Sequence, residues 1–118
     1  MSSRGDVVII RFPFAAGMAG KIRPAVIVQA DAYNRKLHNT IVAGVSRNTR
    51  LAKSEPTQLF VDPTTSEGAL SGLLQPSAVK CESLFTVAVS EIHRTIGRLA
   101  DDLMDQLDEC LKAALGLH

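Results

Sequence analysis

Two short polar segments of the sequence carry the side chains best suited to chemistry on a charged substrate. The first is Lys21-Ile22-Arg23-Pro24, in which Arg23 stands at the start of an apolar run. A guanidinium presents a planar fork of N–H donors that matches the geometry of a phosphate. Because a proline favours extended backbone in the residue before it, Arg23 is predicted to lie at the mouth of a strand. Taken alone, the segment favours the alternative of an exposed or locally paired arginine.

The second segment, Ser46-Arg47-Asn48-Thr49-Arg50, follows another apolar run. It offers a hydroxyl, an amide and two guanidiniums within five residues. A polar turn is the alternative interpretation of this segment. The functional interpretation requires Ser46 and Arg23 to meet in space, as the ends of two neighbouring strands would allow.

Other catalytic signatures are absent from the sequence. It contains no nucleophile elbow, no Walker loop and no dinucleotide-binding motif. The three histidines are scattered, and Cys81 and Cys110 lie in apolar segments without metal-ligand spacing, which predicts buried reduced thiols and no metal or other cofactor. An enzyme of this composition would rely on its substrate for part of the machinery. RNA meets that requirement because its 2′-hydroxyl is a nucleophile, which leaves alignment, proton movement and charge stabilisation to the protein.

The charges divide unevenly along the chain. Residues 1–53 hold nine basic and two acidic side chains, whereas residues 54–118 hold four basic and ten acidic ones, although the net charge is only +1. Such a division favours a polyanionic partner at the basic end. A surface on which folding mixes the charges evenly is the alternative.

The elements that must position these residues are short strands followed by one helix. Apolar or alternating runs bounded by turn residues predict strands at 7–12, 24–30, 40–46, 58–61, 77–82, 85–89 and 95–99. The glycine-containing segment 13–21 is expected to be a mobile loop. Apolar residues at helical spacing, with acids in the first turn and Gly116 at the end, predict an amphipathic helix over 101–115. We therefore expect a mainly β, α+β fold, a small barrel with a C-terminal helix packed on it.

Size and composition restrict the class of protein further. The sequence has 118 residues, of which 46% are apolar. This predicts that residues 1–118 form a single domain that is large enough to bury a core. The sequence has neither an apolar run long enough to span a bilayer nor an N-terminal signal segment. We therefore expect a cytoplasmic protein that does not interact with membranes.

Five segments of the chain occur in an order shared with a known family. They are 4–7 (RGDV), 21–28 (KIRPAVIV), 41–46 (IVAGVS), 72–79 (GLLQPSAV) and 96–99 (IGRL), the last followed by the predicted helix. In this order they resemble the MazF/PemK family of bacterial toxin ribonucleases. The resemblance covers nearly the whole chain. It implies an SH3-like β-barrel of the MazF/CcdB type and a homodimer.

The resemblance also implies an activity and its residues. Members are toxins of type II toxin–antitoxin systems that cleave single-stranded mRNA at specific sequences without a metal. The RNA 2′-hydroxyl attacks the phosphodiester and leaves a 2′,3′-cyclic phosphate and a 5′-hydroxyl. Arg23 and Ser46 match the catalytic positions of the family. The RNA-binding positions of the family correspond to Phe14, Lys21, Ser77 and Glu82. Arg47 and Asn48, which follow Ser46 directly, are further candidates for RNA binding.

Departures and alternatives accompany the resemblance. Ser83 and Phe85 stand where many relatives carry an amide and a basic residue, so no cleavage sequence is transferred. A CcdB-like gyrase poison on the same fold and an inactive family member are the alternatives. Gyrase poisons use an aromatic near the chain end, whereas residues 111–118 contain none. The basic first half further predicts a cognate antitoxin with an acidic tail.

Overall fold

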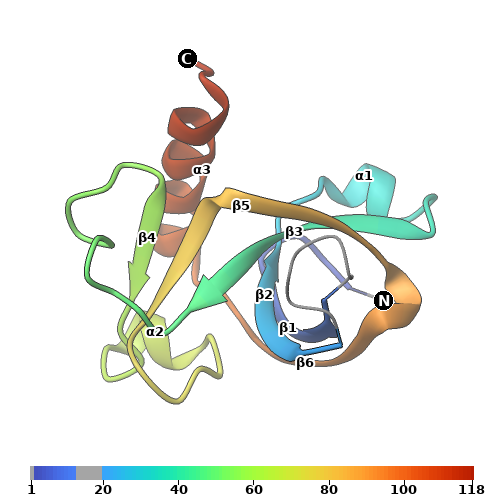
Figure 1. Ribbon diagram of the computed structural model, residues 1–118, viewed down its shortest axis with the longest axis horizontal. Helices are drawn as coiled ribbons and strands as arrows, with labels where there is room; N and C mark the ends of the chain where they lie inside the picture. Colours follow the sequence, from blue (N-terminus) through green and yellow to red (C-terminus); the bar gives the residue numbers. More distant parts are fainter. Residues whose placement is uncertain (1, 13–19) are drawn as a thin grey trace.

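The computed structural model describes residues 2–12 and 20–118, and its main feature is a six-stranded antiparallel sheet (Figure 1). In sheet order the strands run β4-β5-β3-β2-β1-β6. Their bounds are β1 Asp6–Arg11, β2 Ile22–Ile27, β3 Asn39–Ser46, β4 Gln58–Val61, β5 Ser77–Ala88 and β6 Ile92–Arg98. The helix α3, Asp101–Leu115, follows the last strand. The predicted mainly β fold with a C-terminal helix is confirmed.

Strand β5 joins the two halves of the sheet. Its first part pairs with both β4 and β3, and its second part pairs with β3 alone beyond a register shift at Ala43 and Gly44. Figure 1 shows β5 running from beside β4 to the curled half formed with β1, β2 and β6. The prediction of two separate strands at 77–82 and 85–89 was therefore wrong. Residues 81–83 form a β-bulge opposite Ala43 and Gly44, which interrupts the pairing with β3 without ending the strand.

The curled half encloses its own apolar core. Val8, Ile10, Ile27 and Val42 are fully buried there, and Phe12 packs edge-on against Phe85 with ring centroids 5.0 Å apart. Alternate residues of β1 face opposite sides of the sheet, so Val7 belongs to a second core and Ile9 to neither core. Phe85, which departs from the family pattern, is thus part of the packing of this half.

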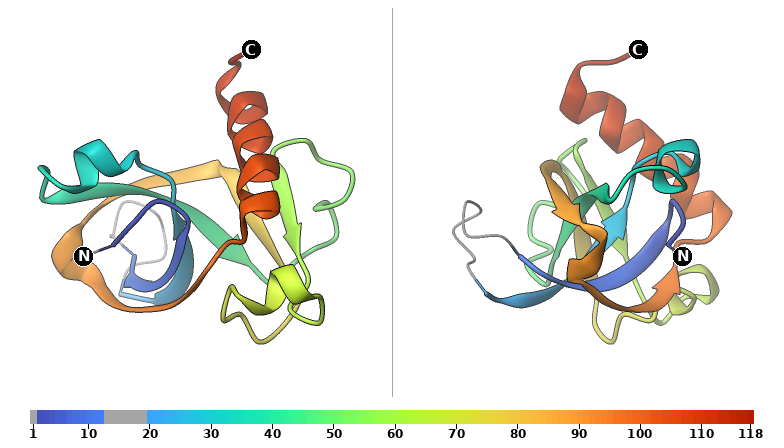
Figure 2. Two further views of the ribbon diagram at one scale, coloured as in Figure 1. Left: turned by 180° about the vertical axis from the view of Figure 1, so that it is seen from behind. Right: turned by 90° about the vertical axis from the view of Figure 1, so that its right-hand side faces the viewer.

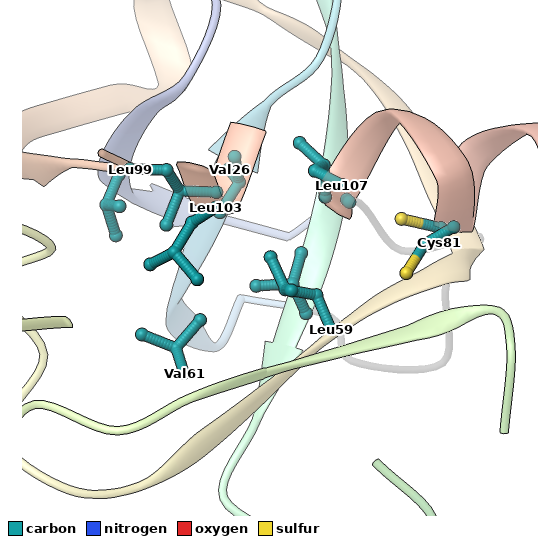
Figure 3. Close-up of a cluster of buried hydrophobic side chains, with 11 residues drawn as sticks. Val26, Leu59, Val61, Cys81, Leu99, Leu103 and Leu107 are labelled. Carbon is teal, nitrogen blue, oxygen red and sulfur yellow. The ribbon is translucent and has the colours of Figure 1, made fainter. Parts of the chain in front are cut away.

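The second core lies between the sheet and α3, which packs on β4 and β5 (Figure 2). The helix buries Leu103, Leu107 and Cys110 at the spacing of one helical face. Figure 3 shows Leu103 and Leu107 projecting toward the apolar residues of β4. Gly116, with φ at 70°, ends the helix in the left-handed conformation that glycine adopts without strain. The predicted helix is confirmed, as is its apolar face.

Cys81 of β5 and Cys110 of α3 both belong to this second core and are free thiols, as predicted. Burial raises the pKa of Cys81 to about 12, and the neighbouring Cys110 contributes in the same direction. Burial also raises the pKa of Cys110. Neither sulfur is therefore prepared for nucleophilic chemistry, because the thiolate is the reactive form.

An ion pair fixes the chain start to the helix. The guanidinium of Arg4 contacts the Asp108 carboxylate at 2.6 Å and donates to the Val28 carbonyl at 2.9 Å. The Arg4 backbone N–H donates to Asp31 at 2.7 Å, and this bond leads the interactions that lower the pKa of Asp31. One arginine of the basic half is thus used for structure.

Three one-turn helices complete the described chain: α1 (Asp31–Asn34), α2 (Ser66–Ala69) and the 3₁₀ turn Val89–Glu91. The first two were not predicted, because four residues are too few to show a helical period. No helix within residues 2–12 and 20–118 has the length and apolar character needed to cross a membrane.

Candidate active site

A groove of about 860 Å³ opens where β2 begins and β3 ends. The groove is lined by residues of five segments: Ile9, Ile22, Arg23, Pro24, Val45, Ser46, Arg47, Gly72, Leu73, Leu74, Gln75, Ser77, Arg94, Thr95 and Ile96. Three of these are arginines and none is acidic. None of the acidic residues of α3 lines it either. The groove is therefore suited to an anionic ligand.

The strand register explains why Arg23 and Ser46 share this groove. Strands β2 and β3 are antiparallel, with Ala25 opposite Gly44. Continuing the same register by two residues sets Arg23 opposite Ser46. Adjacent strands lie about 4.7–4.9 Å apart, and opposite residues point to the same face. The spatial condition that the sequence interpretation required is met.

The Arg23 side chain is exposed, and its fork of donors is largely unused. Its one side-chain hydrogen bond to a described residue runs from a guanidinium nitrogen to the Ile22 carbonyl, at 3.2 Å. Arg23 forms no ion pair with any carboxylate in the part of the chain that the structure describes. A phosphate in the groove could therefore take bidentate hydrogen bonds from this side chain.

Ser46 ends β3 and is half-buried. Its Oγ accepts a hydrogen bond from the Asn48 backbone N–H at 3.1 Å. The Asn48 side chain in turn accepts from the Arg50 backbone N–H at 3.2 Å. The turn thus fixes the Ser46 oxygen while its hydroxyl proton stays available to a ligand. Arg47 lines the groove, whereas Asn48 does not.

The remaining predicted residues are distributed unevenly. Ser77 is 3% exposed, lines the groove and donates to the Gln75 carbonyl at 2.9 Å. Lys21 is exposed just before β2 but does not line the groove. Phe14 lies outside the described residues. The structure thus brings Arg23, Ser46, Arg47 and Ser77 together.

Glu82 lies apart from this group, in the bulged part of β5, and does not line the groove. Its carboxylate accepts hydrogen bonds from Gln58 Nε2 at 2.8 Å and Thr57 Oγ1 at 3.1 Å. Burial opposes its ionisation, but these bonds and one from its own backbone N–H outweigh burial and lower the pKa of Glu82. Glu82 is therefore an anionic acceptor, separate from the three arginines.

Comparison with known proteins identifies the family. Residues 3–115 match the family described as PemK-like, MazF-like toxin of type II toxin–antitoxin system. The chain belongs to this family. It is 30% identical to endoribonuclease EndoA of Bacillus subtilis, over 97% of this chain and 94% of that protein. It is 31% identical to endoribonuclease MazF9 of Mycobacterium tuberculosis, over 99% and 98% of the two chains.

The solved structures agree with this fold. An endoribonuclease in complex with its cognate antitoxin, from a mycobacterial species, superposes with a TM-score of 0.79. The match covers 100% of this chain and 98% of that one at 19% identity. At that identity the likeness concerns the fold, so the MazF-type architecture expected from the sequence is confirmed.

The groove of this MazF-like toxin also contains residues that the sequence did not single out. Arg94 and Thr95 come from β6, and Leu74 and Gln75 come from the loop before β5. The sequence predicted strands at 85–89 and 95–99, so Arg94 fell between two elements. Leu74 is 95% exposed, an unusual position for a leucine. Leu74 and Gln75 lie in the segment 72–79 that resembles the family, but nothing in that segment marked them as groove residues. Arg94 and Thr95 reach the groove through the pairing of β6 with β1.

In this MazF-like toxin the groove combines a hydroxyl and a guanidinium at facing positions. The guanidinium can stabilise the extra negative charge of a phosphate under attack, and the hydroxyl can donate to or accept from the same group. No set of three or more His, Cys, Asp and Glu side chains converges as a metal site among residues 2–12 and 20–118.

Proposed function

We propose that this MazF-family toxin is a metal-independent endoribonuclease that cuts single-stranded mRNA at specific sequences in the Arg23–Ser46 groove. The observation that carries the proposal is that Arg23 and Ser46 line one groove, to which the described residues contribute no carboxylate. Family membership and the name endoribonuclease, which both curated relatives bear, support the activity. They also disfavour the gyrase-poison alternative.

The proposed reaction is an in-line transfer within the RNA. The 2′-oxygen bonds to the phosphorus as its proton leaves, and the bond from phosphorus to the 5′-oxygen breaks as that oxygen gains a proton. The products are a 2′,3′-cyclic phosphate and a 5′-hydroxyl. Arg23 stabilises the additional negative charge on the phosphorane, and the Ser46 hydroxyl orients the scissile phosphate.

Cleavage of a long unstructured RNA in the presence of EDTA tests this proposal. We expect cuts at defined sequences, with 5′-hydroxyl ends. Arg23→Ala should lower the cleavage rate by about 10²–10³-fold, the usual effect of one transition-state contact. Arg23→Lys should also be poor, because a point charge does not replace the bidentate fork.

The control for this experiment is Arg98→Ala, which removes an exposed arginine of β6 that does not line the groove. It should cleave like the wild type. Because Arg23 is exposed and bonds only locally among the described residues, its variants should keep the wild-type unfolding midpoint. Full cleavage by a folded Arg23→Ala protein would remove this arginine from the mechanism.

We further propose that the toxin works as a cytoplasmic homodimer and is silenced by a cognate antitoxin. The mycobacterial relative solved with its antitoxin supports the proposal of an antitoxin.

The groove lining, which includes three arginines and no acidic residue among those described, favours an antitoxin tail rich in Asp and Glu. This tail would occupy the path of the RNA. Antitoxin should therefore displace RNA from a Ser46→Ala toxin in a competition titration. Simultaneous binding without loss of RNA affinity would contradict the shared path, and an active monomer in sedimentation would contradict the dimer.

A further inference from the structure

We propose that Arg94 binds a second RNA phosphate, at the β6 side of the groove. The RNA backbone would then be bound on both sides of the scissile bond. This inference rests on the proposed ribonuclease function and adds a substrate-positioning residue to it. Arg94 does not belong to the basic half of the sequence, and its role follows from where the sheet brings it.

The register of three strands sets the position of Arg94. Ile9 of β1 is opposite Pro24 of β2 on one side and opposite Arg94 of β6 on the other. Opposite residues of antiparallel strands project to the same face. Arg94 therefore shares a face with Ile9 and Pro24, at two strand spacings, or about 10 Å, from β2. Arg23, the residue next to Pro24, is opposite Ile10 and so begins from the other face of β2. Both arginines line the groove, which they reach from different strands.

The side chain of Arg94 is available to a ligand. It is exposed, lines the groove, and forms no ion pair or side-chain hydrogen bond with any residue of the described segments. Among residues 2–12 and 20–118, no carboxylate lines the groove to neutralise it. Its neighbour Thr95 adds a hydroxyl to the groove lining. Three cationic groups without an acidic partner create a positive potential, which an RNA backbone would neutralise.

The surface between the arginines favours contact with phosphate rather than with a base edge. Besides its arginines, the groove is lined by apolar residues, among them Ile9, Pro24 and Val45, and by the polar residues Ser46, Gln75, Ser77 and Thr95. The apolar residues offer van der Waals contact to sugars or base faces. A guanidinium forms stronger hydrogen bonds with a charged phosphate than with a neutral base edge. We therefore assign Arg94 to a phosphate.

Salt-dependent binding of a long unstructured RNA to cleavage-deficient Ser46→Ala toxin tests the assignment. A phosphate contact on a single strand contributes about 0.7 to the slope of log affinity against log salt. Arg94→Gln should reduce the slope by about that amount and weaken binding by about threefold to tenfold at low salt. Arg98→Gln is the matched control, because it removes the same charge from the same strand outside the groove. The slope for Arg98→Gln should equal that of the Ser46→Ala toxin without a second substitution.

Two further measurements separate phosphate contact from other roles. Arg94→Lys should restore most of the slope, since a point charge can still neutralise a phosphate. In a toxin with Ser46 intact, Arg94→Gln should raise KM more than it lowers kcat and leave the cleavage sequence unchanged. A changed cleavage sequence without rescue by lysine would make Arg94 a base-reading residue and overturn the proposal.

The outcomes distinguish this inference from the proposed function. If the wild-type protein neither binds nor cuts RNA, both fail. If it cuts RNA and Arg94→Gln matches Arg98→Gln in slope and affinity, only the role of Arg94 fails. If the salt-dependence slope falls equally in Arg94→Gln and Arg98→Gln, the effect comes from net charge alone. That result would also overturn the role of Arg94.

Discussion

Gly97 determines how closely the loop at residues 70–75 approaches β6, and Gly97→Ala should therefore impair both stability and RNA cleavage. A Cβ at this position would lie 2.4 Å from the Leu70 oxygen and from the Ser71 carbonyl carbon. Ordinary contacts of this kind measure 3.4–4 Å, so the loop must withdraw by roughly 1 Å. Both atoms belong to the backbone and cannot rotate away. Leu73, Leu74 and Gln75, which line the groove, follow directly in the chain.

The magnitude can be worked out from these contacts. Overpacking of this kind costs about 1–3 kcal/mol. The hydrogen bond from the Arg98 N–H to the Leu70 carbonyl, 2.8 Å long, adds about 1 kcal/mol if it is broken. A loss of about 2–4 kcal/mol leaves a domain of ordinary stability mostly folded. For the groove, a displacement of about 1 Å is enough to lower a cleavage rate by up to about 10²-fold.

Urea unfolding followed by circular dichroism, and RNA cleavage measured at low temperature, check the two effects. Gly116→Ala is the control. Gly116 has φ at 70° and open space around it, so alanine there costs roughly 1 kcal/mol of backbone strain at the end of α3 without moving the groove. We expect cleavage to fall in Gly97→Ala and to persist in Gly116→Ala. Wild-type unfolding and wild-type cleavage in Gly97→Ala would refute the argument.

Two further predictions concern the catalytic hydroxyl and a buried thiol. Ser46→Ala should cut RNA at least about 10²-fold more slowly, whereas Ser46→Thr, which keeps the hydroxyl, should cut at close to the wild-type rate. Equal rates for the two variants in single-turnover assays would show that Ser46 only forms the turn. Because burial raises the pKa of Cys81 to about 12, its thiolate fraction at pH 8 is only about 10⁻⁴ in the folded protein. Iodoacetamide at that pH should therefore modify Cys81 only after urea unfolding, as peptide mass spectrometry would detect; rapid labelling of the native protein would contradict its burial.

The sequence alone was sufficient wherever structure depends on neighbours along the chain. Apolar spacing and acids in the first turn predicted the helix at 101–115, and the observed α3 has the same bounds. The short strand at 58–61 was also predicted with its observed ends, because Asp62-Pro63 stops it. The strand predicted at 24–30 corresponds to β2, although the observed strand begins and ends earlier than predicted.

Only the tertiary structure decided which distant residues share the groove. Arg23 and Ser46 were each visible at a strand end, but their facing positions depend on the β2–β3 register. Arg94 joins them because β6 pairs with β1, across irregularities in register that no local pattern predicts. The physical reason is that strand ends are chosen by local residue types, whereas register is fixed by burying one face of the sheet. The sequence therefore specified the chemistry available to this toxin, and the packing of the sheet against its two cores determined which side chains meet.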